Sequence, residues 1–563
     1  IFYKMHALCC DVGSGSVRVA IFEFNDNQLN PKPLAFSTHQ LTIYNRKKNF
    51  YEQKSSEIWQ AFCMAATDCC KQANQNQTPL TIDAIGFTAT CSLVIISGDV
   101  NNLNSKQLSN DYDVIMWMDH RASKEAELIN QTGHQILEQF GGTCSPEFSL
   151  PKLIWIHNND PELFRRTKAF MELPDWLSYR CSNQWSENQP ELFPRSLCSV
   201  VCKWGYDVEQ DKWHSDLFEK LGIKFDESIR MKIGTKIIQP GMMIGHLSAE
   251  IAHQIGISFN GGDQTIKIAC PLIDAHAGAI SMLTFSDRSI SKSNLGKSFE
   301  NILCMIAGTS TCHMVLNQNR TMTKGVWGPY PNAIIPGYYL REAGQSASGA
   351  LVEHIIRQKK SSDGKNFKEI IKKLNHELQA KNFIHQTSLV VNPSFHGNRS
   401  PIADPLLKGA IYGMTLEDES LLEIYGATIE AIAYETKFII EEIERSAQPI
   451  QQVIVSGGLT KNEFYLQKHA DILERKIFVY DLDGTDHMLT GTAIMSFVAA
   501  LNRSNSLNEL ISLLNQVRAK IGDDEKIRIF EPRPEIFDYH RKKYKCYRKL
   551  LECSIEIETI ISS

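Results

Sequence analysis

Residues 8–23 read LCCDVGSGSVRVAIFE, which is an apolar run, a turn of small residues and a second apolar run. In the second run the apolar residues Val17, Val19 and Ile21 occupy alternate positions. A period of two is typical of a β-strand and not of a helix. The stretch therefore predicts a strand, a tight Gly/Ser turn and a returning strand.

The turn of this hairpin is a candidate phosphate-binding loop. Gly13 and Gly15 permit positive φ and let backbone N–H groups approach an anion. Asp11, at the end of the first strand, could hold a metal ion through water. A Rossmann loop is excluded because Arg18 stands at the third glycine position, and a Walker A loop is excluded because the turn has no Lys. An ordinary hairpin with small turn residues is the alternative.

Length and composition indicate a globular protein of at least two domains. The chain has 563 residues, too many for one core. Apolar residues make up 43% and charged residues 22%, values typical of soluble domains. The formal net charge of −5 gives no basic surplus for nucleic acid or an anionic membrane, so neither is expected as a partner.

The fifteen cysteines have no regular spacing, so we interpret them as reduced core residues and not as a disulfide or zinc framework. No signal peptide is evident, and no apolar run is long enough to span a bilayer. Cytoplasmic localisation is therefore expected, and completeness of the N-terminus is left open.

Charged residues follow a predicted buried strand at 114–118. Asp119 and Arg121 stand at its C-terminal end, where ligands collect in open α/β sheets. The alternative is a helix N-terminus with a charged first turn.

Three further charged residues of the first half are candidate ligands. Glu147 precedes an apolar helix after a Gly-Gly turn, Asp175 precedes another, and Lys203 is a single cation in an apolar, Cys-rich segment. Asp175 could instead cap its helix, and Lys203 could be a solvated surface residue.

Asp274 follows an apolar strand at 266–270 and begins a helix of small apolar residues. A carboxylate at that position feels the helix dipole and is well placed to accept a proton in a cleft. A helix-capping role is the alternative, and the two roles can coexist. The nearby His276 is interpreted as a packed histidine.

The second half of the chain repeats the opening pattern. After a polar stretch at 286–301, where we place the main domain boundary, residues 302–316 read ILCMIAGTSTCHMVL. This is again strand, small-residue turn and returning strand. The repeat predicts two similar domains that face a nucleotide with two hairpin turns. A later strand ends at Gly457 and Gly458, against which a base or ribose could lie.

Together these residues resemble the FGGY carbohydrate kinases, members of the actin/Hsp70/hexokinase-like superfamily, over nearly the whole chain. The phosphate and adenosine motifs are DVGSGSVR at 11–18, AGTS at 307–310, and VSGG at 455–458 with Asn462. Residues 149–155 and 409–435 resemble the two family signatures, with Glu147 as a departure from the first. The pentulose-kinase branch, closest to the D-ribulokinase type, is indicated by WMDHRA at 117–122, SLCSVVCKW at 196–204, LIDAHAG at 272–278 and FHGNRSP at 395–401.

The resemblance implies an α/β fold of two ribonuclease H-like domains with a cleft between them. Residues 1–290 would form the N-terminal domain, 300–520 the C-terminal domain and 521–563 a helical extension. The implied reaction is ATP-dependent phosphorylation of a ketopentose at its 5-hydroxyl, first of all D-ribulose, with Mg²⁺. A homodimer is left open.

The resemblance also implies the site residues. Asp274 matches the catalytic base and Asp11 the carboxylate near Mg²⁺. The implied ATP-binding residues are Gly13, Ser14, Gly15, Ser16, Arg18, Gly308, Thr309, Ser310, Gln345, Gly457, Gly458 and Asn462. The implied sugar-binding residues are Lys203, Asp119, Arg121, Glu147, Asp175 and Glu342.

Two alternatives stay open at this point. One is a kinase for another substrate, such as L-ribulose, xylulose, ribitol or glycerol. The other is a non-catalytic relative that uses nucleotide as a conformational switch, against which Asp274 and the polar sugar-side loops argue.

Overall fold

The computed structural model describes residues 4–25, 28–74, 80–97, 112–257, 265–285, 299–359, 367–380, 386–416, 420–482, 484–502, 506–520 and 526–562. Within these ranges the chain forms two compact units. The first unit comprises Ile1–Lys297, Gly328–Leu340 and Leu482–Asp524, and the second comprises Ser298–Trp327, Arg341–Asp481 and Glu525–Ser563. The expected boundary at 286–301 falls mostly on residues 286–298, which lie outside the described residues.

A mixed sheet forms the centre of the first unit. Its strands are β1 (Lys4–Val12), β2 (Ser16–Asn25), β3 (Gln28–Gln40), β6 (Ala84–Ala89), β12 (Met243–His246), β13 (Lys267–Ala269) and β14 (Leu272–Ile273). They lie in the order β12-β13-β6-β1-β2-β3, and β14 pairs with β6. The predicted hairpin is thus present: β1 is antiparallel to β2 and parallel to β6. The register places Asp11 directly opposite Arg18.

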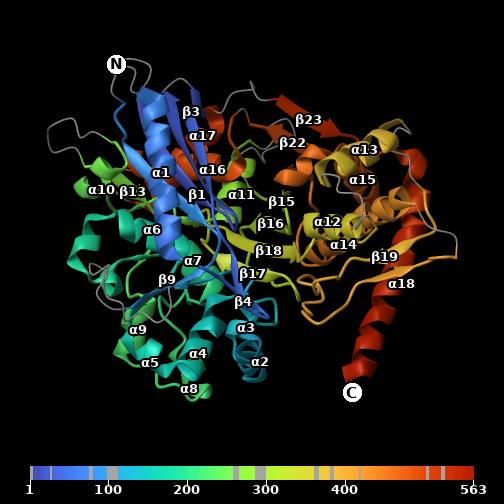
Figure 1. Cartoon of the computed structure of the whole chain (residues 1–563), viewed down its shortest axis with the longest axis horizontal. Helices are drawn as coiled ribbons and strands as arrows, with labels where there is room; N and C mark the ends of the chain where they lie inside the picture. The colour runs from blue at the N-terminus through green and yellow to red at the C-terminus, as the bar shows by residue number, and fades with distance from the viewer. Residues whose placement is uncertain are drawn as a thin grey trace. The chain divides into compact units, whose positions relative to one another are not determined.

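Helices cover this sheet. They include α1 (Ser55–Asn74), α6 (Leu173–Cys181), α11 (Asp274–Phe285), α16 (His487–Leu501) and α17 (Leu507–Lys520). The apolar residues Ile58, Phe62 and Ala66 recur at helical spacing along α1 and are buried, and α1 lies against β2 and β3 (Figure 1). α16 contacts β1, β6 and β13 and also packs against α11. The first unit includes Leu482–Asp524, although the sequence analysis placed residues 482–520 in the C-terminal domain and the residues after 520 in a helical extension.

A five-stranded sheet extends the first unit, in the order β4-β5-β8-β7-β9. Its strands are β4 (Tyr44–Lys47), β5 (Phe50–Gln53), β7 (Leu93–Ser97), β8 (Val114–Ile115) and β9 (Thr167–Glu172). The smaller elements of this unit include α2 (Ser123–Gln131), α3 (Ile136–Gln139), α4 (Ser149–Asn159), α5 (Pro161–Arg166), η1 (Asn183–Glu187), η2 (Pro190–Leu192), β10 (Arg195–Ser196), α7 (Leu197–Lys203), α8 (Ser215–Lys220), α9 (Glu227–Ile233), β11 (Ile237–Ile238) and α10 (Ala249–Gln254).

The second unit repeats the topology of the first. Its main strands are β15 (Ile302–Ala307), β16 (Thr311–Asn317), β18 (Tyr339–Gln345), β21 (Gln452–Ser456), β22 (Ile477–Asp481) and β23 (Lys526–Phe530). They lie in the order β18-β16-β15-β21-β22-β23. β15 is antiparallel to β16 and parallel to β21, as β1 is to β2 and β6. The internal repeat seen in the sequence is therefore a repeat of strand order and direction.

The helices of the second unit include α12 (Gly349–Lys359), α13 (Phe367–Ala380), α14 (Leu421–Arg445), η4 (Gly458–Lys461), α15 (Glu463–Leu473), η5 (Pro534–Ile536) and α18 (Phe537–Ser562). The chain also forms β17 (Trp327–Pro331), β19 (Val390–Asn392) and β20 (Ala410–Tyr412). α14 is buried over most of its length, and α18 packs against α14, α15 and β19. None of the helices in the described ranges combines the length and apolar character needed to cross a bilayer.

Candidate active site

The first candidate phosphate loop connects β1 to β2. The Gly13 N–H donates to the Ser16 carbonyl at 3.0 Å. Neither Gly13 nor Gly15 uses the positive φ that a glycine permits. A Cβ on Gly15 would meet nothing within 4 Å, and one on Gly13 would come no closer than 3.8 Å to the protein. Neither the backbone nor the packing of the chain requires these glycines, so the clearance is available to a group from outside the chain.

The carbonyl groups of Ser14 and Gly15 accept hydrogen bonds from the protein, whereas the N–H groups of these two residues find no acceptor among the described residues. The Ser14 carbonyl accepts from Gln53 Nε2 at 2.9 Å, and Ser14 Oγ accepts from Trp117 Nε1 at 3.0 Å. The Gly15 carbonyl accepts from the Leu41 N–H. In the described part of the chain, the N–H groups of Ser14 and Gly15 donate to no acceptor. A loop whose carbonyls are held from behind while its N–H groups remain available can bind an anion.

The second loop, between β15 and β16, is built in the same way. The Gly308 N–H donates to the Ser310 carbonyl at 2.9 Å, and the Thr309 carbonyl accepts from two N–H groups at the start of α12. Gly349, the first residue of α12, approaches so closely that a Cβ there would lie 2.6 Å from the Gly308 carbonyl oxygen. Within the described ranges, the N–H groups of Thr309 and Ser310 find no protein acceptor.

The two glycines of the predicted adenosine motif differ from each other. Gly457 has a φ of +94°, and a Cβ there would lie 2.4 Å from the Ala307 carbonyl oxygen, so the fold itself requires this glycine. A Cβ on Gly458 would meet nothing within 4 Å. Only Gly458 therefore leaves space that the protein does not use.

The other predicted nucleotide residues of the second unit are bound to protein groups. Asn462 caps α15 by accepting from the Tyr465 N–H, and its Nδ2 donates to Tyr425 Oη at 2.8 Å. Gln345 is buried, and its Nε2 donates to the Ile432 carbonyl at 2.7 Å. These contacts give both side chains a structural role, whether or not a nucleotide also touches them.

Beside the first loop lies a cluster of three carboxylates and one guanidinium, which we call the Asp11 cluster. It consists of Asp11, Arg18, Asp274 and Asp486. Arg18 Nη2 donates to Asp11 Oδ2, and Arg18 Nη1 donates to Asp486 Oδ2 at 2.5 Å. Asp274 is close enough for its charge to act on both Asp11 and Arg18.

The electrostatics of this cluster favour a cation. The pKa of Asp11 is raised to about 7, mainly by burial; the Arg18 charge lowers this pKa, and the Asp486 and Asp274 charges raise it. Asp11 Oδ1 is buried and has no hydrogen-bond partner among the described residues. An orphaned carboxylate oxygen in a cluster with excess negative charge matches the ligand chemistry of Mg²⁺. The residues present therefore fit the predicted metal.

Asp274 is the first residue of α11, as predicted. Its Oδ1 accepts from the Ala275 N–H at 2.7 Å, and the side chain is half-buried. The helix dipole and this hydrogen bond stabilise the carboxylate form. A base at this position can be ionised and still open to a substrate.

Asp119 and Arg121, predicted sugar ligands, are bound mainly to each other. Both Asp119 oxygens accept from the Arg121 guanidinium at 2.8–2.9 Å, and Oδ2 also accepts from the Tyr51 N–H. Arg121 Nη2 also donates to Glu52 Oε1 at 2.8 Å, and the guanidinium stacks on the Phe50 ring. This network holds β5, and with it the neighbouring Gln53, beneath the first loop.

A hollow of about 190 Å³ opens beside Arg121. Its lining includes Arg46, Phe50 and Trp155 but no residue of the Asp11 cluster. This hollow is therefore not the reaction centre that the carboxylates indicate.

Glu147 and Lys203 lie at neighbouring points of the first unit. Lys203 Nζ sits 5.3 Å from the centre of the Phe148 ring, next to Glu147 in the chain. Glu147 Oε1 lies 3.8 Å from His120 Nε2. The buried Lys152 holds this loop, because its Nζ donates to the carbonyls of Met116, Trp117 and Glu147. Lys203 is itself buried, so the solvated alternative is wrong.

The remaining two predicted sugar ligands are both buried. Asp175 lies in the first turn of α6 but does not cap it, since Glu172 holds that position. Asp175 Oδ1 instead accepts from the Ser196 N–H at 2.8 Å, just before α7. Burial raises the pKa of Asp175 to about 7. Glu342, on β18, is 5% exposed.

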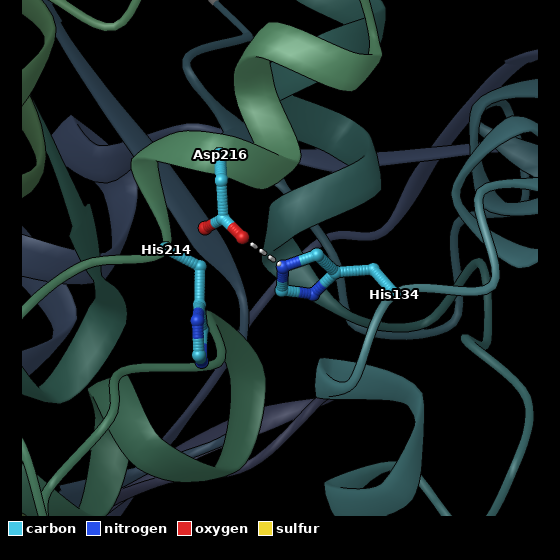
Figure 2. A group of neighbouring side chains, drawn as sticks. All are labelled: His134, His214 and Asp216. Carbon is cyan, nitrogen blue, oxygen red and sulfur yellow. Dashed lines mark hydrogen bonds and ion pairs between the residues drawn. The ribbon is translucent and has the colours of Figure 1, made fainter.

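Elsewhere in the described ranges, His134, His214 and Asp216 bring potential metal-ligand atoms within 4.8 Å of one another (Figure 2). The Ile136 N–H donates to His134 Nδ1 at 3.1 Å, so the His134 proton resides on Nε2 and is donated to Asp216 at 2.8 Å. A metal at Nε2 would require that proton on Nδ1, facing the Ile136 N–H. The geometry is therefore that of a hydrogen-bonded His–Asp pair.

Sequence reasoning missed two residues of the site. Asp486 pairs with Arg18 across 468 positions of the chain; its only local signal is an Asp before an apolar helix. Trp117 was noted only as part of a motif, although its indole N–H binds Ser14. Nothing in the local sequence specifies that contact.

Both halves of the chain match models of known protein domains. Residues 6–280 match the N-terminal domain model of the FGGY family of carbohydrate kinases, and residues 303–500 match the C-terminal one. The human FGGY carbohydrate kinase domain-containing protein is 33% identical, covering 98% of this chain and 97% of its own. A D-ribulokinase from Saccharomyces cerevisiae is 31% identical, covering 82% of this chain and 67% of its own.

Solved structures support the fold. A xyloylose kinase from Brucella ovis superposes with a TM-score of 0.77 at 16% identity, covering 98% of this chain and 100% of its own. Plasmodium falciparum glycerol kinase with ADP gives a TM-score of 0.71 at 18% identity, covering 98% of each chain.

The matches to both domain models and to kinase relatives define a phosphotransferase of the sugar-kinase class. The chain belongs to the FGGY family of carbohydrate kinases.

Proposed function

We propose that this kinase transfers the γ-phosphate of ATP to the 5-hydroxyl of a ketopentose, with D-ribulose as its preferred substrate. The observation that carries the proposal is the Asp11 cluster, in which Asp274 begins a helix beside a loop that can bind phosphate. The alternatives of L-ribulose, xylulose, ribitol and other polyols are outcomes of the experiment below.

Asp274 acts as the general base. As the sugar 5-hydroxyl oxygen attacks the γ-phosphorus, its proton passes to the Asp274 carboxylate, the bond to the β-phosphate oxygen breaks, and ADP leaves. Phosphoryl transfer needs alignment and charge neutralisation more than covalent chemistry. One well-placed base contributes about 10²–10⁴-fold to such a step.

The protein neutralises phosphate charge with backbone donors. The available N–H groups of Ser14 and Gly15, and those of Thr309 and Ser310 in the second unit, are suited to phosphate oxygens. Asp11 Oδ1 would hold Mg²⁺, which when bound supplies charge neutralisation at the phosphates. Arg18 keeps Asp11 in place through its other oxygen.

Sugar recognition is assigned to the charged residues of the first unit. Lys203 and Glu147 are the proposed sugar contacts, because Lys152 fixes the loop that carries Glu147 and Lys203 Nζ lies over the ring of Phe148, the next residue in that loop. Asp119 and Arg121 support the site through the first loop, because their hydrogen-bonding capacity is largely used within the protein. Asp175 and Glu342 stay candidate ligands.

The choice of D-ribulose rests on relatives. The Saccharomyces cerevisiae protein that matches most of this chain is a D-ribulokinase, and Staphylococcus aureus proteins at 29% identity are ribulokinases. Hydroxyl stereochemistry depends on single side chains, so the substrate must be measured.

The test is a panel of D-ribulose, L-ribulose, D-xylulose, ribitol and glycerol at a fixed MgATP concentration, ranked by kcat/KM. We expect D-ribulose to rank first by at least about tenfold, the effect of one well-made polar contact. A higher kcat/KM for any other member of the panel would overturn the assignment of D-ribulose.

A further inference from the structure

Arg18 is shared between two carboxylates from distant parts of the first unit. Its Nη2 reaches Asp11 Oδ2 on β1, and its Nη1 reaches Asp486 Oδ2 at the start of α16. Asp11 is fully buried, whereas the side chains of Arg18 and Asp486 are 25% and 26% exposed. The guanidinium therefore joins the buried strand to the end of a helix.

Asp486 is held on its other side by the helix it caps. Its Oδ1 accepts from the Leu489 N–H at 3.0 Å. The two oxygens of this carboxylate therefore have different partners: Oδ1 caps α16, and Oδ2 accepts from Arg18. The position of Asp486 is set by α16 and not by Arg18.

α16 is in turn locked against α11, the helix that begins with Asp274. A Cβ on Gly491 of α16 would lie 1.8 Å from the Ala277 carbonyl oxygen of α11, so the two helices touch backbone to backbone. Ser281 Oγ and His487 Nδ1 lie 2.9 Å apart across the same contact. The N-terminus that carries Asp486 is therefore fixed relative to the N-terminus that carries Asp274.

The pairing of Arg18 with Asp11 is one-sided. Arg18 contacts only Oδ2, while Asp11 Oδ1 and Arg18 Nε are both buried without a hydrogen-bond partner among the described residues. Arginine and a carboxylate normally prefer two parallel hydrogen bonds. Because Nη1 is held by Asp486, the end-on pairing that would use Nη1 and Nη2 for both Asp11 oxygens is not available to this guanidinium.

We propose that Asp486 is a positioning residue: by holding Arg18 at Nη1, it restricts Arg18 to one oxygen of Asp11 and leaves Oδ1 open to the divalent cation. The inference rests on the proposed function for the role of that cation. It concerns how the chain keeps a ligand atom available, and it assigns a task to the start of α16.

The experiment uses Asp486→Asn in the full chain, with Mn²⁺ as the probe. Asn caps helices as well as Asp, so α16 is retained while the charge that holds Arg18 is lost. Mn²⁺ binding to the nucleotide-free protein is measured by electron paramagnetic resonance. We expect a Kd about tenfold higher than in the wild type, and near-wild-type binding in Asp486→Glu, which restores the charge.

Two comparisons separate positioning from other causes. Asp226→Asn removes the charge of another N-cap residue, which caps α9, and should leave Mn²⁺ binding unchanged. In an Arg18→Gln background, Asp486→Asn should have no further effect, because Asp486 acts only through Arg18. A simple loss of negative charge would weaken binding in either background.

Kinetics give a second, independent readout. At limiting Mg²⁺, Asp486→Asn should lower the rate about tenfold, and saturating Mg²⁺ should restore it; the KM for the sugar should stay within about twofold, since Asp486 is not a proposed sugar contact. Because Mn²⁺ binding needs no turnover, a wild type without sugar-dependent ATP consumption would overturn the proposed function and still leave the metal test decisive. Wild-type Mn²⁺ affinity in Asp486→Asn, a persisting effect in Arg18→Gln, or no Mn²⁺ binding by the wild type would overturn the inference.

Discussion

The glycines of the site have two different roles, and the structure is needed to distinguish these roles. Gly457 is required by the fold, because its φ is +94° and the Ala307 carbonyl oxygen lies where a Cβ would be. Gly15 has neither constraint. A glycine that neither backbone conformation nor packing requires is a candidate for a ligand-binding surface.

Gly15→Ala should therefore fold normally and bind ATP poorly. Because Gly15 has ordinary φ and open space around it, alanine should leave stability unchanged or raise it by about 0.4–1 kcal/mol. The methyl group would occupy the phosphate side of the loop and raise the KM for ATP about tenfold. Thermal melting and ATP titration of one preparation measure both effects.

Gly457→Ala is the matched control for that variant. It should lower the melting temperature clearly, because the new Cβ would lie 2.4 Å from a backbone oxygen. Equal loss of stability in the two variants, or an unchanged KM for ATP in Gly15→Ala, would contradict the assignment of Gly15 to the phosphate side.

The small residues and carboxylates of the site could be predicted, but their partners could not. Asp11, Asp274 and the two turns stand in local patterns that carry their chemistry. Asp486 has a complete local explanation as a helix cap, and its pairing with Arg18 spans 468 residues. The helix-capping role accounts for an Asp at position 486, and no neighbouring residue in the sequence indicates a second role.

At the scale of elements, hydrophobic period predicts a helix such as α1, whereas a polar motif does not indicate whether its residues bind a ligand or other parts of the protein. α1 spans Ser55–Asn74, as its stripe predicts. Asp119 and Arg121, in contrast, form a network that supports β5 and the first loop. Charged residues at a strand end can hold other elements as well as a substrate, and composition does not distinguish these roles.

α14 carries a buried acid whose ionisation should affect stability. Glu435 accepts from Asn398 Nδ2 at 2.6 Å, and burial raises its pKa to about 8. Because the folded state binds this proton more tightly than the unfolded state, the contribution of Glu435 to stability is fully present below about pH 4.5 and is lost as the pH rises through about 8.

Glu435→Gln should remove that pH dependence while keeping the acceptor for Asn398. Urea midpoints of both proteins between pH 5 and pH 9 measure it. We expect the variant to gain stability relative to the wild type up to about pH 8 and the difference to level off above it. Parallel curves for the two proteins would show that Glu435 does not titrate in this window.

At the scale of the whole molecule, the repeated hairpin predicted two similar units, and strand order bears this out. The path of the chain between units was not predictable from linear order. Residues 482–524 belong to the first unit because α16 packs on β1 and α11. The return of the chain to the first unit is determined by packing between residues far apart in the sequence, and a single sequence carries no local signal for such packing.

The C-terminal helix is an integral part of the second unit. Tyr547 is fully buried in a cluster with Tyr434, Phe438 and Leu551. Tyr547→Ala should lower the free energy of unfolding by about 3–5 kcal/mol, the usual cost of deleting a buried aromatic ring. Denaturant titration of the full chain measures the loss.

The control for this helix is Tyr547→Phe. The Tyr547 hydroxyl is buried without a hydrogen-bond partner in the described part of the chain, so its removal should be neutral or slightly stabilising. A loss in Tyr547→Phe as large as in Tyr547→Ala would mean that the hydroxyl, and not the ring, holds α18 in place.

The claim that Asp274 is the general base of a sugar kinase is tested by measuring ATP consumption of the wild type and Asp274→Asn, each with and without D-ribulose. We expect the sugar to stimulate the wild type. In Asp274→Asn, kcat should fall at least ~100-fold with KM values for ATP and sugar nearly unchanged. Wild-type turnover in Asp274→Asn, or no stimulation of the wild type by D-ribulose or any other sugar, would contradict the claim.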